Sequence, residues 1–318
     1  MKILITGGSG YLAGRLAHYL KKTCNYQIIL GSRKHTNYNM LNSEFQIMQT
    51  IWNSEEKLKF ICEGIDTIIH LAGINASDSL ADPDLALEFN GVVTGKLIRA
   101  AVKSGVKKFI YFSTAHVYKS PLNGIITEET LPKSLHPYAT SNIAGEDMVL
   151  SAHKQNEIQG IVIRLSNSFG APVNKEANCW MLLVNDLCKQ AINSGKMKLT
   201  STGMQRRDFI AISDVCRVVE HLLKLSFPFG RNNLFNVGGK WSPTVWEIAG
   251  IICKMSKKIL FFEPELSRRE PLPSEFTENF EYNIARLEET GFIMGNNRED
   301  EILNLLQFCQ TNFSSDKK

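Results

Sequence analysis

Short apolar runs alternate with longer amphipathic stretches through the first half of the chain. The intervening stretches have helical spacing, and one of them carries Leu12, Leu16 and Leu20 on a single face. Two more are a helix through Cys62 that Ser54 can cap and a long helix over about residues 84–104. Strands that alternate with helices of this length require parallel pairing through right-handed crossovers. We therefore expect an α/β fold with a doubly wound parallel sheet, a Rossmann architecture whose ligands lie beyond the carboxyl ends of the strands. The runs that fit strands lie at residues 3–6, 26–30, 66–73, 108–112 and 161–165.

The alternation loosens after residue 170. We predict a helix over residues 178–194, a helix opened by Ser213, and a helix after Thr244, which stands three residues before Glu247 in capping-box spacing. The chain thus predicts two regions. Residues 1–170, with a contribution from about 207–240, form the dinucleotide-binding domain, and residues 171–318 form a smaller, mixed α/β substrate-binding region.

Composition narrows the class of protein without naming it. The net charge of +4 is mild and is not concentrated in a basic block, so we expect no nucleic-acid partner. A small anionic ligand would explain this positive charge equally well. Seven scattered cysteines without a Cys-x-x-Cys pair fit free thiols in a reducing compartment, and we expect no metal site. No apolar run reaches membrane-spanning length and no signal peptide precedes the first strand, so we expect a cytoplasmic protein.

The strongest local pattern is the glycine segment over residues 6–14. Gly7 permits a tight turn, Gly10 lets the backbone approach a pyrophosphate, and the following helix N-terminus offers N–H donors and a positive dipole end. Ala13 stands where a third glycine often stands. An ordinary strand-to-helix turn would also contain glycines, but the position at the first strand favours a dinucleotide site. The coenzyme contacts predicted here are Gly7, Gly10, Tyr11 and Leu12.

The end of the second strand indicates which dinucleotide binds. An NAD site usually places a carboxylate there, whereas a 2′-phosphate favours arginine. This chain has Ser32, Arg33 and Lys34 and no acid. We expect NADP as the coenzyme, with NAD as the second choice. The alternative is that these basic residues are only a solvated loop.

Hydroxyl and imidazole side chains follow the later strands. Thr114 and His116 come directly after residues 108–112, and Tyr138 and Asn142 are four residues apart, so they share one face of a predicted helix. The next predicted strand, residues 161–165, ends at Leu165 and is followed by Asn167. These positions are expected to meet at the carboxyl edge of the sheet.

With these segments in hand, the chain resembles the extended short-chain dehydrogenase/reductase family of nucleotide-sugar epimerases, dehydratases and reductases. The resemblance implies a catalytic hydroxyl at Thr114, a catalytic tyrosine at Tyr138 and an arginine at Arg207 that contacts the nucleotide diphosphate. It also implies a homodimer built from the helices that hold Asn90 and Tyr138. The coenzyme contacts that it adds are Leu71, Ala72, Gly73, Asn90, Tyr138, Asn142 and Leu165. Its substrate contacts are Thr114, His116, Asn167 and Arg207.

Two departures from the family pattern affect the chemistry. The lysine of the Tyr-x-x-x-Lys motif is Asn142 here, and an amide carries no charge to favour tyrosinate. The 4,6-dehydratases place Asp-Glu after the catalytic hydroxyl, where this chain has Ala115 and His116. The usual acid and base for elimination of water are therefore missing. His116 is either an acid or base beside the substrate or a structural histidine at a strand end.

We expect an NADP(H)-dependent oxidoreductase that reduces a 4-keto sugar nucleotide, a step of surface-polysaccharide or deoxysugar biosynthesis. The alternatives are a nucleotide-sugar 4-epimerase and a weakly active or non-catalytic nucleotide-binding member of the fold. Arg268 and Arg269, in a region rich in proline and charge, are either a second diphosphate clamp or a solvated loop. The nucleotide base, the sugar and the stereochemistry are not readable from the sequence.

Overall fold

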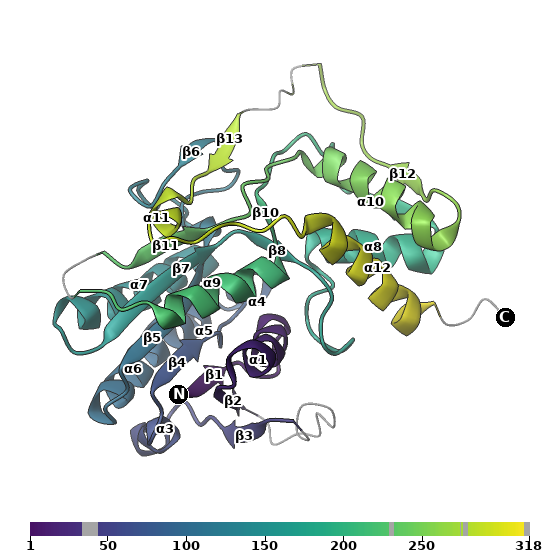
Figure 1. Cartoon of the computed structure of the whole chain (residues 1–318). Coiled ribbons are helices and arrows are strands. Elements are labelled where there is room, and N and C mark those ends of the chain that lie inside the picture. The colour runs from purple at the N-terminus through teal and green to yellow at the C-terminus, as the bar shows by residue number, and fades with distance from the viewer. Residues whose placement is uncertain (34–43, 229–231, 274, 276–278, 315–318) are drawn as a thin grey trace. The chain divides into compact units, whose positions relative to one another are not determined.

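The computed structural model describes residues 1–33, 44–228, 232–273, 275 and 279–314 (Figure 1). The chain divides into two compact units. Unit 1 comprises Met1–Ser120, Thr130–Leu165 and Glu220–Asn236, and unit 2 comprises Pro121–Glu129, Ser166–Val219 and Val237–Lys318.

Unit 1 is built on a parallel sheet. Within the described residues the sheet has seven strands in the order β11-β7-β5-β4-β1-β2-β3. The pairs β7-β5, β5-β4, β4-β1, β1-β2 and β2-β3 are parallel. The central strand β1 buries Ile3, Leu4 and Ile5 completely, as a strand covered on both faces requires. The strands are β1 (Lys2–Thr6), β2 (Gln27–Ser32), β3 (Gln46–Gln49), β4 (Thr67–His70), β5 (Lys108–Thr114), β7 (Gln159–Leu165) and β11 (Leu234–Val237).

The predicted doubly wound sheet is confirmed, with helices between its strands (Figure 1). The helical elements are α1 (Tyr11–Cys24), α3 (Glu55–Cys62), α4 (Ala76–Ala81), α5 (Pro83–Ala86), the π-helix η1 (Leu87–Val93), α6 (Thr94–Lys103), the 3-10 turn η2 (Ala115–Val117) and α7 (Pro137–Lys154). Helix α9 (Ile212–Lys224) starts in unit 2 and ends in unit 1.

One buried lysine ties β5 to the end of α9. The Lys108 ammonium donates to the carbonyl oxygens of Leu222, Leu223 and Leu225, at 3.0, 2.8 and 2.6 Å. The last carbonyls of a helix lack partners within the helix, so this cation satisfies them and opposes the negative end of the helix dipole.

Unit 2 is a helical layer with short strand pairs. Helices α8 (Leu183–Ser194), α10 (Val245–Leu260) and α12 (Arg298–Phe313) bury one apolar cluster that includes Leu187, Ile248 and Leu305. Its remaining elements are β6 (Gly124–Ile126), β8 (Asn167–Phe169), β9 (Lys196–Lys198), β10 (Phe209–Ala211), β12 (Glu265–Ser267), β13 (Phe280–Tyr282) and α11 (Ala285–Glu288). The strands pair as β10-β8, β12-β9 and β13-β6, all parallel.

Two helix predictions needed correction. The helix predicted from residue 178 starts at Leu183, because turns occupy the preceding residues and Leu182 N–H bonds the Cys179 carbonyl. The helix predicted over residues 84–104 is interrupted by η1, a π-helical turn. The caps at Ser54 and Thr244 are confirmed, the second as a complete capping box.

None of the seven cysteines forms a disulfide bond. Only Cys24, at the end of α1, is partly exposed. Burial raises the pKa of Cys62 to about 12 and that of Cys179 to about 11. The buried thiols are therefore protonated and poorly reactive at neutral pH.

Candidate active site

The glycine segment forms the turn that the sequence predicts. Gly7 has a φ of +70°, and a Cβ there would lie 2.9 Å from the Ala72 nitrogen, so only glycine lets β1 and the end of β4 approach this closely. No side chain caps the N-terminus of α1 and no acid stands in its first turn. The segment therefore fits the pyrophosphate of a dinucleotide, with Tyr11 and Leu12 in the first turn of the helix.

A buried hydrogen-bond chain fixes the neighbouring loop. The Thr6 hydroxyl lies 2.7 Å from His70 Nδ1 and accepts the N–H groups of Leu71 and Ala72, both at 3.2 Å. On the other side of the ring, His70 Nε2 lies 3.2 Å from the Thr94 hydroxyl. Burial lowers the pKa of His70 to about 3, so the ring is neutral and one nitrogen can accept while the other donates. This series of hydrogen bonds holds Leu71 and Ala72, two of the predicted coenzyme contacts, at the end of β4.

Asn90 fixes the same loop from the π-helix. Its side-chain oxygen accepts the Ile74 N–H at 2.8 Å, and its amide donates to the Ile74 carbonyl and to the Ser141 hydroxyl at 2.9 Å. Gly73 is exposed between these anchors, and a Cβ there would lie 3.2 Å from Asn90 Oδ1. Asn90 is buried, so its clearest role is to hold the loop against which a coenzyme would lie.

The end of β2 presents Arg33 to solvent. Ser32 is buried, whereas Arg33 is exposed, with its guanidinium carbon 6.0 Å from the centre of the Phe89 ring. Arg33 makes no ion pair with any carboxylate that the structure describes. Lys34, the other basic residue of this loop, lies outside the described residues.

Thr114, His116 and Tyr138 come together in unit 1. Thr114 lies close enough to Tyr138 to affect the pKa of the phenol. The Thr114 hydroxyl accepts the N–H of His116 at 3.2 Å, and the His116 and Tyr138 rings meet edge to face with centres 6.4 Å apart. Burial raises the pKa of Tyr138, and the nearby Thr114 side chain opposes that effect. The phenol is therefore protonated at neutral pH, the state of a general acid.

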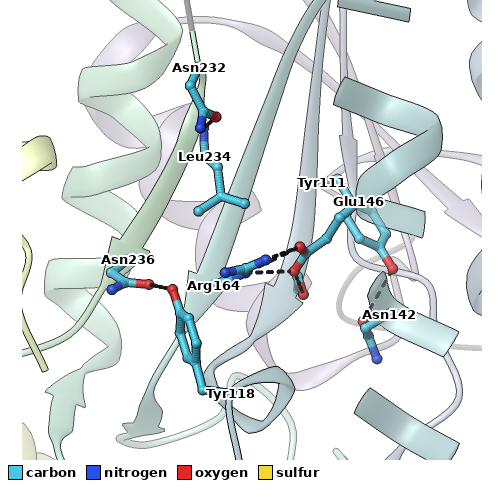
Figure 2. A network of polar contacts seen from close by, with 9 residues as sticks. Tyr111, Tyr118, Asn142, Glu146, Arg164, Asn232, Leu234 and Asn236 are labelled. Atoms are coloured by element: carbon cyan, nitrogen blue, oxygen red, sulfur yellow. Dashed lines mark hydrogen bonds and ion pairs between the residues drawn. The ribbon is translucent and has the colours of Figure 1, made fainter. Parts of the chain in front are cut away.

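Asn142 occupies the position one helical turn after Tyr138 and is buried. Its amide nitrogen donates to the Tyr138 carbonyl at 2.6 Å, and its oxygen accepts the Tyr111 hydroxyl at 3.2 Å (Figure 2). Both ends of the amide therefore bind protein. One amide hydrogen remains for a ribose hydroxyl, and no positive charge stands at this position.

The sequence analysis missed a buried ion pair beneath the Thr114 loop. The Arg164 guanidinium of β7 binds Glu146 of α7 at 2.6 Å, and the Ser113 hydroxyl donates to the same carboxylate (Figure 2). Burial lowers the pKa of Arg164, but Glu146 outweighs that effect and raises it. Tyr118 packs its ring 4.7 Å from the guanidinium. A buried charge needs a partner, so Arg164 inside a strand was the signal that could have revealed this pair.

The Tyr118 hydroxyl extends this network to β11. It donates to Asn236 Oδ1 at 2.6 Å (Figure 2). The network thereby joins β5, α7, β7 and β11 within unit 1 around the residue that precedes Thr114. Leu165, the last residue of β7, is partly exposed beside it in the chain.

In unit 2, Arg207 binds a neutral partner. Its guanidinium donates twice to the Gln205 side-chain oxygen, at 3.0 and 2.9 Å, and makes no ion pair with a carboxylate among the described residues. The neighbouring carboxylate of Asp208 accepts instead from Ser166 and from the N–H groups of Gly239 and Trp241. Burial lowers the pKa of Arg207. A partly buried guanidinium without a counter-ion fits an anion-binding role.

Arg268 contacts the same loop as Arg207. It donates to the Thr202 carbonyl at 3.0 Å and stacks over the Trp246 ring at 4.1 Å. Arg269 is exposed. Asn167 lies on β8, where its amide donates to the Asp208 carbonyl at 2.9 Å. Unit 2 thus gathers Arg207 and Arg268 around residues 202–205.

The described residues contain no group of three His, Cys, Asp or Glu side chains arranged to hold a metal ion. Within the same residues, every helix is too short or too polar to cross a membrane.

Comparison with known proteins gives a family match. Residues 3–238 match the model of the NAD dependent epimerase/dehydratase family. A dTDP-D-glucose 4,6-dehydratase of Bos taurus is 29% identical over 271 residues, covering 81% of this chain and 73% of that protein. A Dictyostelium discoideum protein of the same name is 27% identical over 286 residues, and the alignment spans 81% of this chain and 61% of that protein.

Solved structures share the fold. The UDP-glucose 4-epimerase of Thermotoga maritima, with UDP-glucose, has a TM-score of 0.81 and 21% identity, covering 98% of this chain and 99% of that one. The UDP-glucuronic acid 4-epimerase of Bacillus cereus, with UDP-glucuronic acid and NAD, has a TM-score of 0.80 and 23% identity, with the same coverage. The relatives named here are dehydratases and epimerases, and the coenzyme in the Bacillus cereus structure is NAD. The family match and these relatives support a nucleotide-sugar epimerase or dehydratase, and they do not support the expected reductase or NADP as the first-choice coenzyme.

Proposed function

The chain belongs to the NAD-dependent epimerase/dehydratase family, and on that premise we propose that it is a nucleotide-sugar 4-epimerase. In this proposal it binds a nicotinamide dinucleotide and a nucleotide-diphosphate sugar and inverts a ring carbon through a keto intermediate. The observation that carries the proposal is the cluster of Thr114, His116 and Tyr138 in the unit that also holds the glycine turn. The Thr114 hydroxyl accepts the His116 N–H, and the His116 ring meets the Tyr138 ring edge to face.

The coenzyme would be held by the glycine turn, the loop after β4 and the residues that follow β2. When bound in its oxidised form, it would accept the hydride from the sugar carbon and return it to the keto intermediate. The family and the solved neighbours support NAD, whereas Arg33 and the missing acid at the end of β2 support NADP. We propose that Arg33 lets the protein accept the 2′-phosphate.

Tyr138 would move the proton at the sugar oxygen. It takes the proton from the C4 hydroxyl during oxidation and returns it during reduction, while Thr114 donates a hydrogen bond to the same oxygen. His116 lies beside Tyr138 and provides an imidazole as a second side chain that can exchange a proton.

The substrate diphosphate would bind Arg207, with Arg268 as a second cation on the same loop. The test is the affinity of wild-type protein and Arg207→Ala for UDP and dTDP by calorimetry. We expect a loss of about tenfold, because a charge-assisted hydrogen bond contributes about 1.5–3 kcal/mol. An unchanged affinity, or a collapse of the melting temperature, would assign Arg207 a structural role.

Turnover is the decisive experiment for the function. Purified protein is incubated with UDP-glucose, UDP-glucuronic acid or dTDP-glucose and with NAD or NADP, and the sugars are analysed by NMR. Appearance of the C4 epimer without net change in the coenzyme supports the proposal. Tyr138→Phe should abolish it with the melting temperature retained. Binding of coenzyme and nucleotide without any conversion would instead identify a non-catalytic member of the fold.

A reductase of 4-keto sugars is the second candidate, and the state of Tyr138 favours it. A protonated phenol beside Asn142 suits delivery of a proton to a keto oxygen better than removal of one from a hydroxyl. Net oxidation of NADPH with a 4-keto sugar nucleotide, and no epimerisation of ordinary sugars, would select this candidate. A 4,6-dehydratase has less support, because Ala115 and His116 supply no carboxylate.

We also propose a homodimer through the outer side of α5, η1 and α7. Exposed apolar side chains on these elements are Leu85, Leu87, Val92 and Met148. Scattered exposed leucines are common, but four on neighbouring elements of unit 1 fit a buried contact between two copies.

A further inference from the structure

Unit 2 carries an open hollow beside α10. Its volume is about 680 Å³, within the range of small-molecule sites, and every residue that lines it belongs to unit 2. The proposed function does not use this space, because neither Arg207 nor Arg268 lines it. Its charge, its aromatic rings and its floor determine what the hollow can hold.

Cations outnumber acids on the walls of the hollow. Of the residues that line it, Arg206, Lys240 and Lys254 are cations and Glu247 is an acid. Glu247 pairs with Arg206 at 3.4 Å, and Glu288 pairs with Lys240 at 2.8 Å. Lys254 is exposed and forms no ion pair with a carboxylate in the described part of the chain. The walls therefore favour an anionic ligand.

Two indole rings add a flat apolar surface to the same hollow. Trp241 and Trp246 line it, and both are partly exposed. The Arg298 guanidinium lies 5.0 Å from the centre of the Trp241 ring, and that of Arg268 lies 4.1 Å from the Trp246 ring. These cation–π contacts help to fix the two rings. An aromatic ring that stays partly in water can stack with the planar group of a ligand, and every nucleobase has such a face.

Gly250 keeps the floor of the hollow open. It lies in the interior of α10, where glycine is less favourable than alanine. Beyond the backbone of its own helix, a Cβ at this position would meet no atom within 4 Å, so no packing contact requires a glycine. Trp246 lies one helical turn before it on the same face. The helix thus leaves room beside an indole ring at a cost to its own stability.

The hollow is separate from the proposed diphosphate site. Arg206 and Thr244 form an antiparallel bridge, so the segment around Arg206 is extended. Successive side chains of an extended segment point to opposite sides. Gln205 and Arg207 bind each other on one side. Arg206 lines the hollow instead and donates to the Ser242 carbonyl at 2.9 Å.

We propose that this hollow is a second nucleotide site, distinct from the sites for the coenzyme and the substrate. A nucleoside diphosphate places its base against the indole surfaces over Gly250 and its phosphates toward Arg206 and Lys254. A nucleotide fits because one ligand must match both a planar apolar surface and a cationic wall. The site shares no side chain with the glycine turn, with Thr114 and Tyr138, or with Arg207, so it goes beyond the proposed function.

The test counts UDP sites by calorimetry in saturating NAD. Wild type should bind two UDP molecules per chain, one at the substrate site and one in the hollow. Gly250→Leu should bind only one, because leucine fills the hollow, and should keep or raise the melting temperature, because leucine is the better helix former. Lys254→Gln should weaken the second site about tenfold for UDP and for inorganic pyrophosphate, through loss of a charge-assisted bond. Lys258→Gln, an exposed lysine of the same helix outside the hollow, is the matched control.

The two proposals fail in different ways. Arg207→Ala should weaken the substrate site and leave the second site unchanged. A single UDP site in wild type, weakened by Arg207→Ala and unaffected by Gly250→Leu, would overturn the second site and leave the epimerase proposal intact. Pyrophosphate that binds the hollow as tightly as UDP would also overturn it, because the base would then make no contact. A second UDP site lost in Gly250→Leu, in a protein without any turnover, would support the hollow and contradict the epimerase proposal.

Discussion

Asn142 stands one helical turn after Tyr138, where the family resemblance implies a lysine, and the pKa of Tyr138 should control the pH profile. Burial raises the pKa of the phenol. An epimerase needs tyrosinate to begin oxidation, so kcat/KM should rise with pH and show no plateau below about 10. In Asn142→Lys the added charge favours tyrosinate and should move the rising limb to lower pH. Initial rates over pH 6–11 measure both profiles.

The matched control is Asn142→Met, which fills the position without a charge and should leave the limb where it is in wild type. A reductase would behave oppositely, because it needs the protonated phenol, and its kcat/KM would stay flat and fall only at high pH. A rising limb that Asn142→Lys does not move would show that another group supplies the base.

His116 lies beside Tyr138, and its chemistry shows in isotope exchange. A base next to a keto group can remove the adjacent C–H proton, since the enolate is stabilised by the hydroxyls of Thr114 and Tyr138. We expect deuterium from solvent to enter the sugar at the carbon next to the ketone in wild type and not in His116→Asn. Mass spectrometry of the recovered sugar nucleotide measures this. Without exchange in wild type, His116 would be a structural residue.

Single residues show how far sequence reasoning reaches. Thr114, His116 and Tyr138 were expected together because the carboxyl ends of parallel strands share one edge, and the structure joins them. The partner of Asn142 was not foreseen. Tyr111 reaches it from β5 within the core, and no spacing in the sequence encodes that contact.

At the scale of elements, Lys108 should stabilise the end of α9. Replacing it with methionine keeps the apolar stem but leaves three helix-end carbonyls without their donor. We expect the unfolding free energy to fall by about 2–3 kcal/mol, the range for bonds to a charged group. Urea unfolding measures the change. Lys107→Met, at the exposed neighbouring position, should change it by less than about 0.5 kcal/mol.

The Asp208 side chain, next to β10, binds Ser166 on one side and Gly239 and Trp241 on the other. Its titration should make the unfolding free energy depend on pH. Burial raises the pKa of Asp208 to about 6, although Ser166, Gly239, Trp241 and the charge of Arg298 oppose the shift. The folded state then holds a proton that the unfolded state releases near pH 4. Stability therefore falls by up to about 3 kcal/mol as pH rises from about 4 to 6.

Asp208→Asn should remove that slope, because its amide oxygen can still accept from Gly239 while the side chain no longer titrates. Melting temperatures between pH 4 and 7 measure it. The control is Asp300→Asn on the exposed start of α12, which should keep the wild-type slope. Parallel curves for all three proteins would place the titration elsewhere.

The helices and strands also differ in how well the sequence predicted them. Strands β1, β2, β4, β5 and β7 were predicted because each buried run ends at small or polar residues, and the cap at Thr244 because its spacing is local. Strand β3 was not predicted, because none of its four residues is buried and it lacks a buried apolar run. The π-turn at Leu87–Val93 was not, since its sequence suits an ordinary helix and the extra residue is set by packing on α7. The pairing of β6 with β13 joins residues far apart in sequence, which no local pattern reveals.

At the scale of the whole molecule, the proposed homodimer gives a direct prediction. Val92→Lys with Met148→Lys places two charges on the outer apolar side chains of unit 1, where burial without a partner is unfavourable. Sedimentation velocity should show a dimer for wild type and a monomer for the double variant. Phe60→Lys, an exposed apolar position on α3, should remain dimeric. A wild-type monomer at all concentrations would refute the proposed contact.

Cys24 makes the molecule selectively labelable. It is the one partly exposed thiol, and it ends the helix that begins at the glycine turn. Fourteen helical residues rise by about 21 Å, a separation suited to energy transfer. A maleimide dye at this single position would sit at a known distance from the coenzyme loop. Reduced nicotinamide is itself fluorescent, so energy transfer between it and the dye would report coenzyme binding and release without any substitution in the chain.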